Sequence, residues 1–400
     1  MSKTPSLDEF RAEARAWLAS VTSLRPAGGS TWGVGDDSVV VFDNWTDDEE
    51  AELVAAGRAW ERMRFDAGWG AIAWPADYGG RSLPQRYAEA YEAEELQFTT
   101  PRRNELFEVT RLMVAPTVGT WGTPAQQRDF IVPLLRTDLL CCQLFSEPDA
   151  GSDLAGVSTQ AKRHGDTWIL NGQKVWTSGA RSADYGLAIC RSDPTTAKHA
   201  GLTAFLVPLD AQGVTVRPIK QMSGGASFNE VFLDDVRLSD ETRLGPEGSG
   251  WKVALTTLAA ERGAANSLGG GTIEQVIALA RALGATNEPH VRQLLADAYI
   301  HTRVHDLNVA RVSSALEGGD TPGPEGSIGR LSATRNLTRL AEVACRLLGP
   351  RITADTGEWG TFAWNEHFLG APGYRIAGGS DEIQHNIIGE RVLGLPREPR

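Results

Sequence analysis

Residues 143–156 read Gln-Leu-Phe-Ser-Glu-Pro-Asp-Ala-Gly-Ser-Asp-Leu-Ala-Gly, and residues 171–180 read Asn-Gly-Gln-Lys-Val-Trp-Thr-Ser-Gly-Ala. The first stretch gathers hydroxyls, carboxylates and glycines at one turn, where backbone N–H groups can approach a ligand. A plain Asx or Ser turn remains open as the alternative. In the second stretch Trp176 precedes two hydroxyl side chains. Its indole can either stack on a planar ligand or lie on the core of a sheet.

The sequence on either side of these stretches indicates the fold. Up to residue 138 apolar residues recur at helical spacing, and Ser6 with Glu9 predicts a capping box. Residues 139–245 contain short β-rich runs, and Asn171-Gly172 between two of them predicts a hairpin turn. Helical spacing returns over 246–400. We therefore expect an α+β protein with an N-terminal α-helical domain (1–138), a middle antiparallel β-sheet or β-barrel domain (139–245) and a C-terminal helical domain (246–400).

The composition excludes several classes of protein. Asp plus Glu is 51 against 39 for Lys plus Arg, a net charge of −12, so we expect no nucleic-acid partner. No apolar run approaches the roughly 18 residues of a membrane helix, so no membrane partner is expected either. Four cysteines without a C-x-x-C pair fit a cytoplasmic location. His301 and His305 have metal-capable spacing but no third ligand nearby, so we expect no metal site.

The two quoted stretches, with the α–β–α order around them, resemble the acyl-CoA dehydrogenase family. Residues 146–153 match the family's S/T-E-x-x-x-G-S-D loop, and residues 171–178 match its N-G-x-K-x-W-x-[ST] strand. Segments 245–251 and 379–391 fall where the family has counterparts. The resemblance implies a C-terminal four-helix bundle, FAD held between the sheet domain and the C-terminal helices, and an acyl-CoA thioester as substrate.

The resemblance also assigns contacts residue by residue. The resemblance places Gln143, Phe145 and Ser146 at the pyrimidine side of the flavin ring, and Trp176 and Ser178 at the ring edge near N5. Thr177 between them is expected to bind the cofactor too, and Ser380 and Glu382 of the final helix are expected to supply further FAD contacts. Ser152 is expected at the pantetheine or phosphate end of the substrate.

The catalytic base is expected on the first helix of the C-terminal domain. In most family members a Glu precedes the Gly-[ST]-x-x-Ile-Gln run, but here Gly378 stands at that position. Some members place the Glu directly before an Arg on this helix, where this chain has Glu261 and Arg262. Glu261 also follows, at helical spacing, an expected apolar stripe of Trp251, Ala254, Leu255 and Leu258. We therefore expect Glu261 to be the base, Arg262 to contact substrate, and Gly378 to offer its backbone N–H to the thioester carbonyl.

Two segments of this chain differ from the family pattern in ways that concern its oligomeric state. Family members carry a segment with an Arg that reaches the FAD pyrophosphate, and of that segment this chain keeps only Arg281. Family members also have a glycine-rich run that binds adenine, and here residues 346–351 replace it. These changes resemble heterotetrameric members, and we expect a homo- or heterotetramer, or a dimer. The family resemblance also implies an electron-transfer flavoprotein as electron acceptor. Two alternatives stay open: a flavin oxidase or monooxygenase of the same fold, and a non-catalytic structural subunit.

Overall fold

The computed structural model describes residues 4–25, 39–264, 269–317, 323–354 and 361–397. The chain packs into two compact units. The first consists of Met1–Ala27, Trp45–Lys220 and Ala226–Glu261, and the second of Gly28–Asn44, Gln221–Gly225 and Arg262–Arg400. The first unit contains the sheet and the helices around it, and the second is helical.

Among the residues that the structure describes, six α-helices precede the sheet in the first unit. They are α1 (Leu7–Val21), α2 (Asp47–Asp66), α3 (Gln85–Glu95), α4 (Glu105–Glu108), α5 (Ala115–Trp121) and α6 (Pro124–Leu135). A π-helical segment, Val109–Val114, joins α4 to α5. The expected capping box is confirmed, since Glu9 N–H donates to Ser6 Oγ at 3.3 Å and Ser6 N–H donates to Glu9 Oε2 at 2.8 Å.

A buried ion network joins these helices. The side chain of Glu61 on α2 is 0% exposed and contacts three guanidinium groups. Arg103 Nη1 lies 2.6 Å from Glu61 Oε1, while Arg64 Nε and Arg111 Nη1 lie 3.0 and 3.1 Å from Glu61 Oε2. Burial by itself would raise the pKa of Glu61, but the positive charges of Arg111, Arg64 and Arg103 lower it. Glu61 therefore holds three cations in place inside the helical layer.

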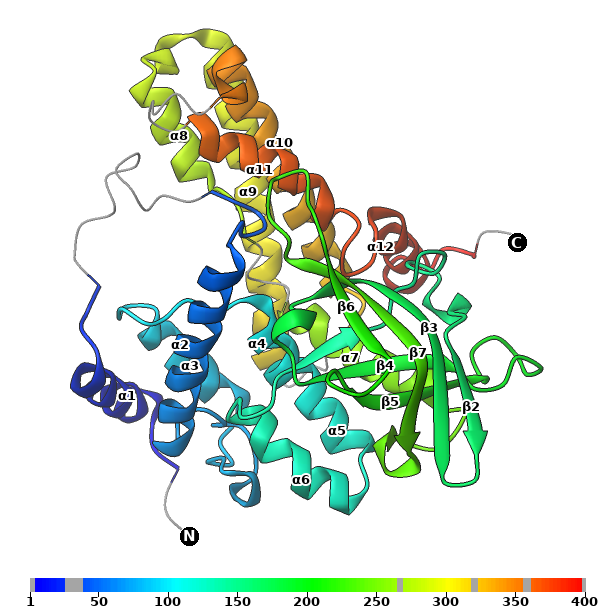
Figure 1. The fold of residues 1–400 in the computed structure, drawn as a ribbon. Coiled ribbons are helices and arrows are strands. Elements are labelled where there is room, and N and C mark those ends of the chain that lie inside the picture. Colours follow the sequence, from blue (N-terminus) through cyan, green and yellow to red (C-terminus); the bar gives the residue numbers. More distant parts are fainter. Residues whose placement is uncertain (1–3, 26–38, 265–268, 318–322, 355–360, 398–400) are drawn as a thin grey trace. The chain divides into compact units, whose positions relative to one another are not determined.

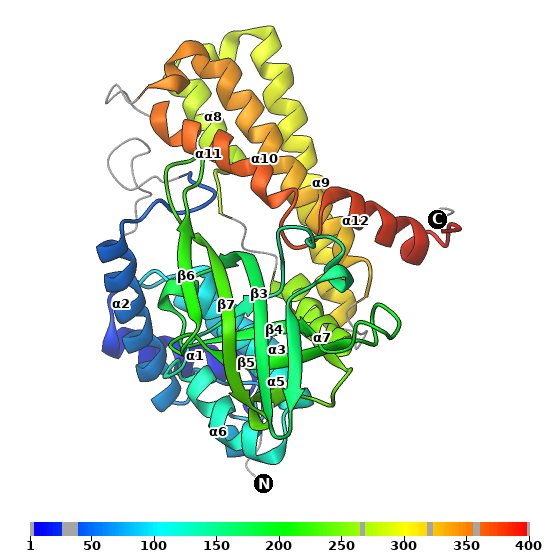
Figure 2. The ribbon, with the colours of Figure 1, turned by 45° about the vertical axis from the view of Figure 1, so that its right-hand side comes forward.

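The sheet has eight strands, in the order β6-β7-β3-β2-β4-β5-β8, with β1 beside β4. Figure 2 shows β6, β7 and β3 side by side. The strands are β1 (Cys141–Leu144), β2 (Gln160–His164), β3 (Thr167–Ser178), β4 (Tyr185–Arg191), β5 (Leu202–Pro208), β6 (Val214–Ile219), β7 (Phe228–Ser239) and β8 (Arg243–Leu244). Most pairs are antiparallel as expected, but β4 pairs in parallel with β1 and at one position with β2. The expected α+β fold is confirmed.

The predicted hairpin turn at Asn171-Gly172 is wrong. Strand β3 runs through both residues with a register shift against β7 between Leu170 and Gly172. Glycine is needed at residue 172 because the strand passes close to Thr159 there: a Cβ on residue 172 would lie 2.4 Å from Thr159 Oγ1. The chain reverses instead at the two-residue link between His164 and Thr167, where Gly165 has φ +63°.

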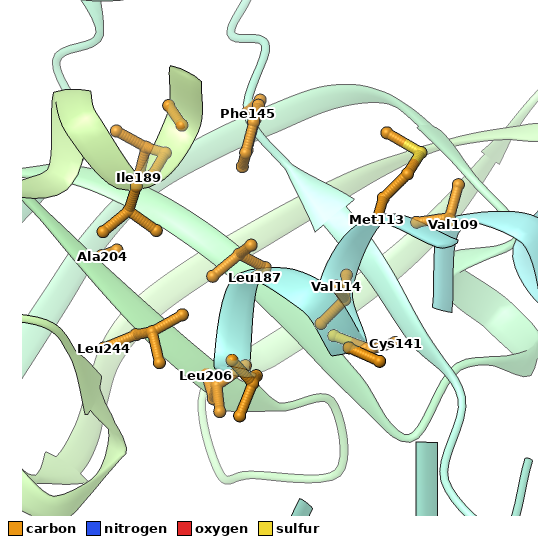
Figure 3. Packing of buried hydrophobic residues seen from close by; sticks show 14 of the residues in the cluster. Val109, Met113, Val114, Cys141, Phe145, Leu187, Ile189, Ala204, Leu206 and Leu244 are labelled. Carbon is orange, nitrogen blue, oxygen red and sulfur yellow. The ribbon is translucent and has the colours of Figure 1, made fainter. Parts of the chain in front are cut away.

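The helices cover the sheet through a continuous apolar core (Figure 3). Val109, Met113 and Val114 of the π-helical segment belong to the same buried cluster as Cys141 of β1 and Leu187 of β4. The adjacent Cys142 is also buried, and burial raises the pKa of both thiols, as is typical of unreactive cysteines in a strand. This core fixes the end of β1, from which the loop of residues 145–153 starts.

The second unit is built from helices α8 (Ile273–Ala282), α9 (Pro289–Glu317), α10 (Gly326–Leu348), α11 (Thr361–Tyr374) and α12 (Asp381–Ile387), the last continuing into a π-helical turn, Ile388–Val392. Figure 1 shows α9 and α10 running alongside each other. Trp364 and His367 of α11 are fully buried, and His367 Nε2 lies 2.9 Å from the Leu337 carbonyl oxygen. Among the residues that the structure describes, no helix is long and apolar enough to cross a membrane.

Replacing Glu61 by Gln should destabilise the first unit strongly. The change removes the carboxylate that Arg64, Arg103 and Arg111 share, although Arg64 and Arg103 keep Glu95 as a second partner. We expect the loss to cost about 3–5 kcal/mol of unfolding free energy. Because the folded pKa of Glu61 is lowered, this contribution is present above the pKa of an unfolded Glu and disappears as pH falls through the folded value. Urea denaturation of both proteins at several pH values measures it.

Asp129→Asn is the matched control, because Asp129 pairs with Arg128 on the surface, where their side chains are 57% and 72% exposed. Little change is expected there. Equal denaturation midpoints for wild type and Glu61→Gln would contradict the role given to Glu61.

Candidate active site

A buried ion pair connects the two sequence stretches that define the site. Lys174 Nζ on β3 lies 2.7 Å from Glu147 Oε1 in the loop after β1, and the two side chains are 0% and 4% exposed. The ammonium also donates to the carbonyl oxygens of Phe145, at 3.2 Å, and Ile189, at 2.7 Å. All three of its hydrogens therefore have acceptors, which a buried ammonium requires.

Glu147 in turn organises the far end of its loop. Its carboxylate accepts hydrogen bonds from Ser158 N–H at 2.6 Å, Ser158 Oγ at 2.9 Å and Thr159 N–H at 3.0 Å. Burial alone would raise the pKa of Glu147, but Lys174 and these hydrogen bonds lower it to about 2. The carboxylate is therefore ionised at neutral pH, and the loop of residues 148–157 is closed at its base.

The end of β3 presents an exposed indole on a strained backbone. Trp176 has φ +59°, lies within a register shift between Lys174 and Thr177, and is 60% exposed. Its ring meets Phe228 edge-to-face at 6.1 Å. A bulky residue in the left-handed region is uncommon and is typical of functional sites. Trp176 and Ser178 consequently lie on a side of the strand that a planar ligand can reach, whereas Thr177 is 2% exposed.

Several predicted contacts lie around this strand end. Gln143 Nε2 and Thr177 Oγ1 are buried, and neither has a hydrogen-bond partner in the described part of the chain. Such polar atoms fit a ligand that offers ring nitrogens or carbonyl oxygens. The side chain of Phe145, by contrast, is 7% exposed and belongs to the apolar core, which leaves its backbone for a ligand (Figure 3). Ser146 is fixed through its carbonyl oxygen, which accepts from Val175 N–H at 2.9 Å.

Positive charge gathers beside the exposed Ser152. Asp153 forms an ion pair with Lys198, and Arg191 donates to the carbonyl oxygens of Lys198 and Ala155, both at 2.6 Å. These contacts join the loop of residues 148–157 to the connection between β4 and β5. Arg191 and Lys198, the latter paired with Asp153, are thereby held at the loop that carries Ser152, the residue expected to contact the substrate's polar end.

Helix α7 (Gly250–Ala264) includes the backbone of Glu261 and Arg262, whose side chains lie outside the described residues. Val253, Ala254 and Thr257 are buried on this helix. The expected stripe is wrong at one position, because Leu255 is 42% exposed.

Two hydroxyls of α7 attach it to α5 within the first unit. Thr257 Oγ1 lies 3.0 Å from Thr117 Oγ1, and Thr256 Oγ1 accepts from Trp121 Nε1 at 2.9 Å. The buried face of α7 is therefore set partly by threonines, which apolar spacing alone does not reveal.

In the second unit, Gly378 lies in a clamped turn before α12. Gly378 and Gly379 have φ +64° and +90°, a conformation that costs a residue with a side chain about 1–2 kcal/mol. Gln384 Nε2 donates to both of their carbonyl oxygens at 3.1 Å, and Arg330 donates to the Ala377 carbonyl oxygen at 2.7 Å. The backbone at the expected carbonyl-polarising position is thus held in a form that suits glycine.

The remaining predicted residues of the second unit lie at helix ends. Ser380 is the N-cap of α12, with its Oγ accepting from Ile383 N–H at 3.4 Å. Glu382 is exposed in the first turn of α12, and Arg281 is exposed in the last turn of α8. His305 bonds Ser332 Oγ at 2.7 Å and His301 lies 3.6 Å from Asp297, so both histidines have local packing partners.

Comparisons with known proteins identify the family. Residues 39–138, 142–236 and 248–393 match the models of the acyl-CoA dehydrogenase N-terminal, middle and C-terminal domains. The acyl-CoA dehydrogenase IpdE1 of Mycobacterium tuberculosis is 36% identical over 402 residues, covering 98% of this chain and 99% of that protein. The chain belongs to the acyl-CoA dehydrogenase family. It is an oxidoreductase of the class whose members are flavoproteins.

Solved structures agree with this family. A structure described as the Tcur3481-Tcur3483 steroid ACAD has a TM-score of 0.77 at 27% identity, covering 99% of each chain. The ChsE4-ChsE5 complex from Mycobacterium tuberculosis has a TM-score of 0.73 at 26% identity, covering 99% of each chain. The expected family and fold are therefore confirmed.

Sequence reasoning missed the pairing of Glu147 with Lys174 and a contact of Glu105 with Ser178. The first had a signal, because a Lys among apolar strand residues needs a buried counter-charge. The second had none, since 73 residues separate its partners and Glu105 begins an ordinary helical run.

Replacing Glu147 by Gln should open the loop and destabilise the first unit. The Lys174 ammonium would remain buried without its counter-charge, for an expected loss of about 3–5 kcal/mol. With a folded pKa of about 2, the Glu147 contribution is complete above the unfolded pKa and is lost as pH falls from about 4.3 toward 2. Denaturant unfolding at pH 7 and pH 3 measures both effects.

Asp153→Asn is the control from the same loop, because the Asp153–Lys198 pair is 64% and 50% exposed. A loss as large as that of Glu147→Gln in this control would contradict the special role of the buried pair.

Proposed function

We propose that this protein binds FAD and oxidises an acyl-CoA thioester between its α and β carbons. The observation that carries the proposal is the exposed Trp176, held at φ +59° next to Ser178, in a chain of this family. The buried, unpartnered amide nitrogen of Gln143 adds support, because it requires an acceptor.

FAD, when bound, supplies an acceptor for the hydrogen that leaves the β carbon as hydride. Gln143, Ser146 and the backbone of Phe145 would hold the polar side of its ring, and Trp176 and Ser178 the opposite edge. Thr177, Arg281, Ser380 and Glu382 stay predicted FAD contacts. The residues of the first unit fit such a group, since they combine an exposed aromatic face with unpaired buried polar atoms.

Glu261 would remove the α-proton, since a carboxylate in an apolar pocket has a pKa closer to working pH than a free one. The backbone N–H of Gly378 would polarise the thioester carbonyl and stabilise the negative charge that develops there. Ser152 and Arg262 would hold the substrate's polar portions. Arg191 and Lys198, joined near Ser152, give an acidic protein a place for the phosphates of coenzyme A.

Glu261→Gln tests the assignment of the base. The variant should retain bound FAD, with its yellow absorbance, and lose reduction of the flavin by substrate, because Gln cannot accept a proton. Anaerobic absorbance spectra with and without acyl-CoA measure this. Glu274→Gln on α8 is a control for loss of a carboxylate elsewhere. Undiminished bleaching in Glu261→Gln would reject Glu261 as base, and a colourless wild-type chain would reject the proposed function.

The acyl group is proposed to be branched or bulky. Gly378 lacks the side chain that most relatives carry at this position, which leaves more room, and the similar solved protein is described as a steroid ACAD. Branched or steroid-like thioesters should therefore reduce the flavin faster than butyryl-CoA. Stopped-flow bleaching rates across straight-chain, branched and polycyclic thioesters measure the order. A clear preference for butyryl-CoA would contradict it.

Electrons are proposed to pass to an electron-transfer flavoprotein, and the active form is proposed to be an oligomer. The similar ChsE4-ChsE5 structure is a complex of two chains. In this chain, Ile300, Val304 and Leu307 on one face of α9 are 58%, 49% and 64% exposed, an apolar surface that another acyl-CoA dehydrogenase chain can cover. Light scattering on the chain purified alone distinguishes a homo-oligomer from a chain that needs a second subunit.

A further inference from the structure

A carboxylate from a distant helix contacts the hydroxyl at the end of β3. Ser178 Oγ donates a hydrogen bond to Glu105 Oε2 at 3.0 Å, and Glu105 is the first residue of α4. Both residues belong to the first unit. Because a carboxylate oxygen accepts this hydrogen bond, the hydrogen of Ser178 Oγ points at Glu105.

The approach of these two segments is built into the backbone. Gly179 follows Ser178 with φ +65°, and a Cβ at that position would lie 3.0 Å from the Leu106 side chain. Strand β3 is held on its other side by Asn229, whose Nδ2 donates to the Thr177 carbonyl oxygen at 3.0 Å. The Ser178–Glu105 contact therefore joins two positions that packing and hydrogen bonding already fix.

This contact determines what the hydroxyl can offer to a ligand. A serine hydroxyl has one hydrogen, and an ionised carboxylate can only accept. While that hydrogen points at Glu105, Ser178 Oγ presents lone pairs. Nitrogen N5 of a flavin is an acceptor in the oxidised ring and bears a hydrogen in the reduced ring. A hydroxyl turned toward Glu105 thus matches the reduced ring, whereas the oxidised ring requires it to turn away.

We propose that Glu105 is a positioning residue that acts through the Ser178 hydroxyl to favour the reduced state of a flavin bound beside Ser178. The inference rests on the proposed function, which places the flavin edge at Ser178. Two effects of Glu105 oppose each other: its negative charge disfavours added electrons, and its hydrogen bond favours them. The charge acts from an exposed side chain and is screened by salt, and it acts whether or not Ser178 is present. The hydrogen-bond effect requires Ser178.

A double-mutant cycle on the flavin midpoint potential separates these effects. The proteins are FAD-loaded wild type, Glu105→Gln, Ser178→Ala and the double variant, each titrated against redox dyes. Glu105→Gln should lower the ratio of reduced to oxidised flavin about tenfold when Ser178 is present, which is about 30 mV for a two-electron couple. In the Ser178→Ala background the same substitution should leave the potential unchanged or raise it. Circular dichroism checks that all four remain folded.

Glu108→Gln is the matched control, because Glu108 is an exposed carboxylate on the same short helix. It should produce no shift that depends on Ser178. Equal shifts for Glu105→Gln in both backgrounds, or no shift in either, would overturn the role of Glu105 while leaving FAD binding intact. A wild-type chain that takes up no FAD in a fluorescence titration would overturn the proposed function and this role together.

Discussion

The buried ion pair between Glu147 and Lys174 holds together the two segments from which the candidate site is made. Burying two charges is costly, and the cost is offset only when every hydrogen and lone pair finds a partner. Here the ammonium reaches two carbonyl oxygens as well as the carboxylate, and the carboxylate accepts from the backbone at Ser158 and Thr159. Such a network tolerates few alternative arrangements, so it specifies one loop conformation rather than merely adding stability.

The strained backbone of Trp176 depends on the rigidity that this ion-pair network gives to the site. Trp176 adopts a left-handed backbone conformation that a bulky residue avoids unless its surroundings impose it. Two residues earlier, Lys174 is anchored in the core, and one residue later, the carbonyl of Thr177 is bound by the buried Asn229. The indole is therefore exposed because the strand on both sides of it cannot move. In the second unit a left-handed backbone occurs at Gly378, where glycine adopts it without penalty and Gln384 holds it.

Much of the fold was predictable from local patterns. Helices α2 (Asp47–Asp66) and α6 (Pro124–Leu135) both lie in the part of the chain up to residue 138 where apolar residues recur at helical spacing. The errors have physical causes. Asn171-Gly172 has the composition of a hairpin turn, but Gly172 serves a close approach to Thr159 inside a continuous strand. Within the C-terminal helical range, Gly370, Pro372 and Gly373 weaken the helical signal, yet α11 continues through them to Tyr374 because tertiary packing overrides the local preference.

The sequence by itself determined the family, the order of helices and strands, and the kinds of side chain available for chemistry, because these follow from residue type and spacing along the chain. It also places glycine at residue 378, where the family resemblance implies a carboxylate. Only the tertiary structure decided that Glu147 neutralises Lys174 and that Glu105 accepts the hydrogen of Ser178. Tertiary packing brings such partners together across tens of residues. A charge pair or hydrogen bond between residues so far apart leaves no periodic pattern in the sequence from which it could be predicted.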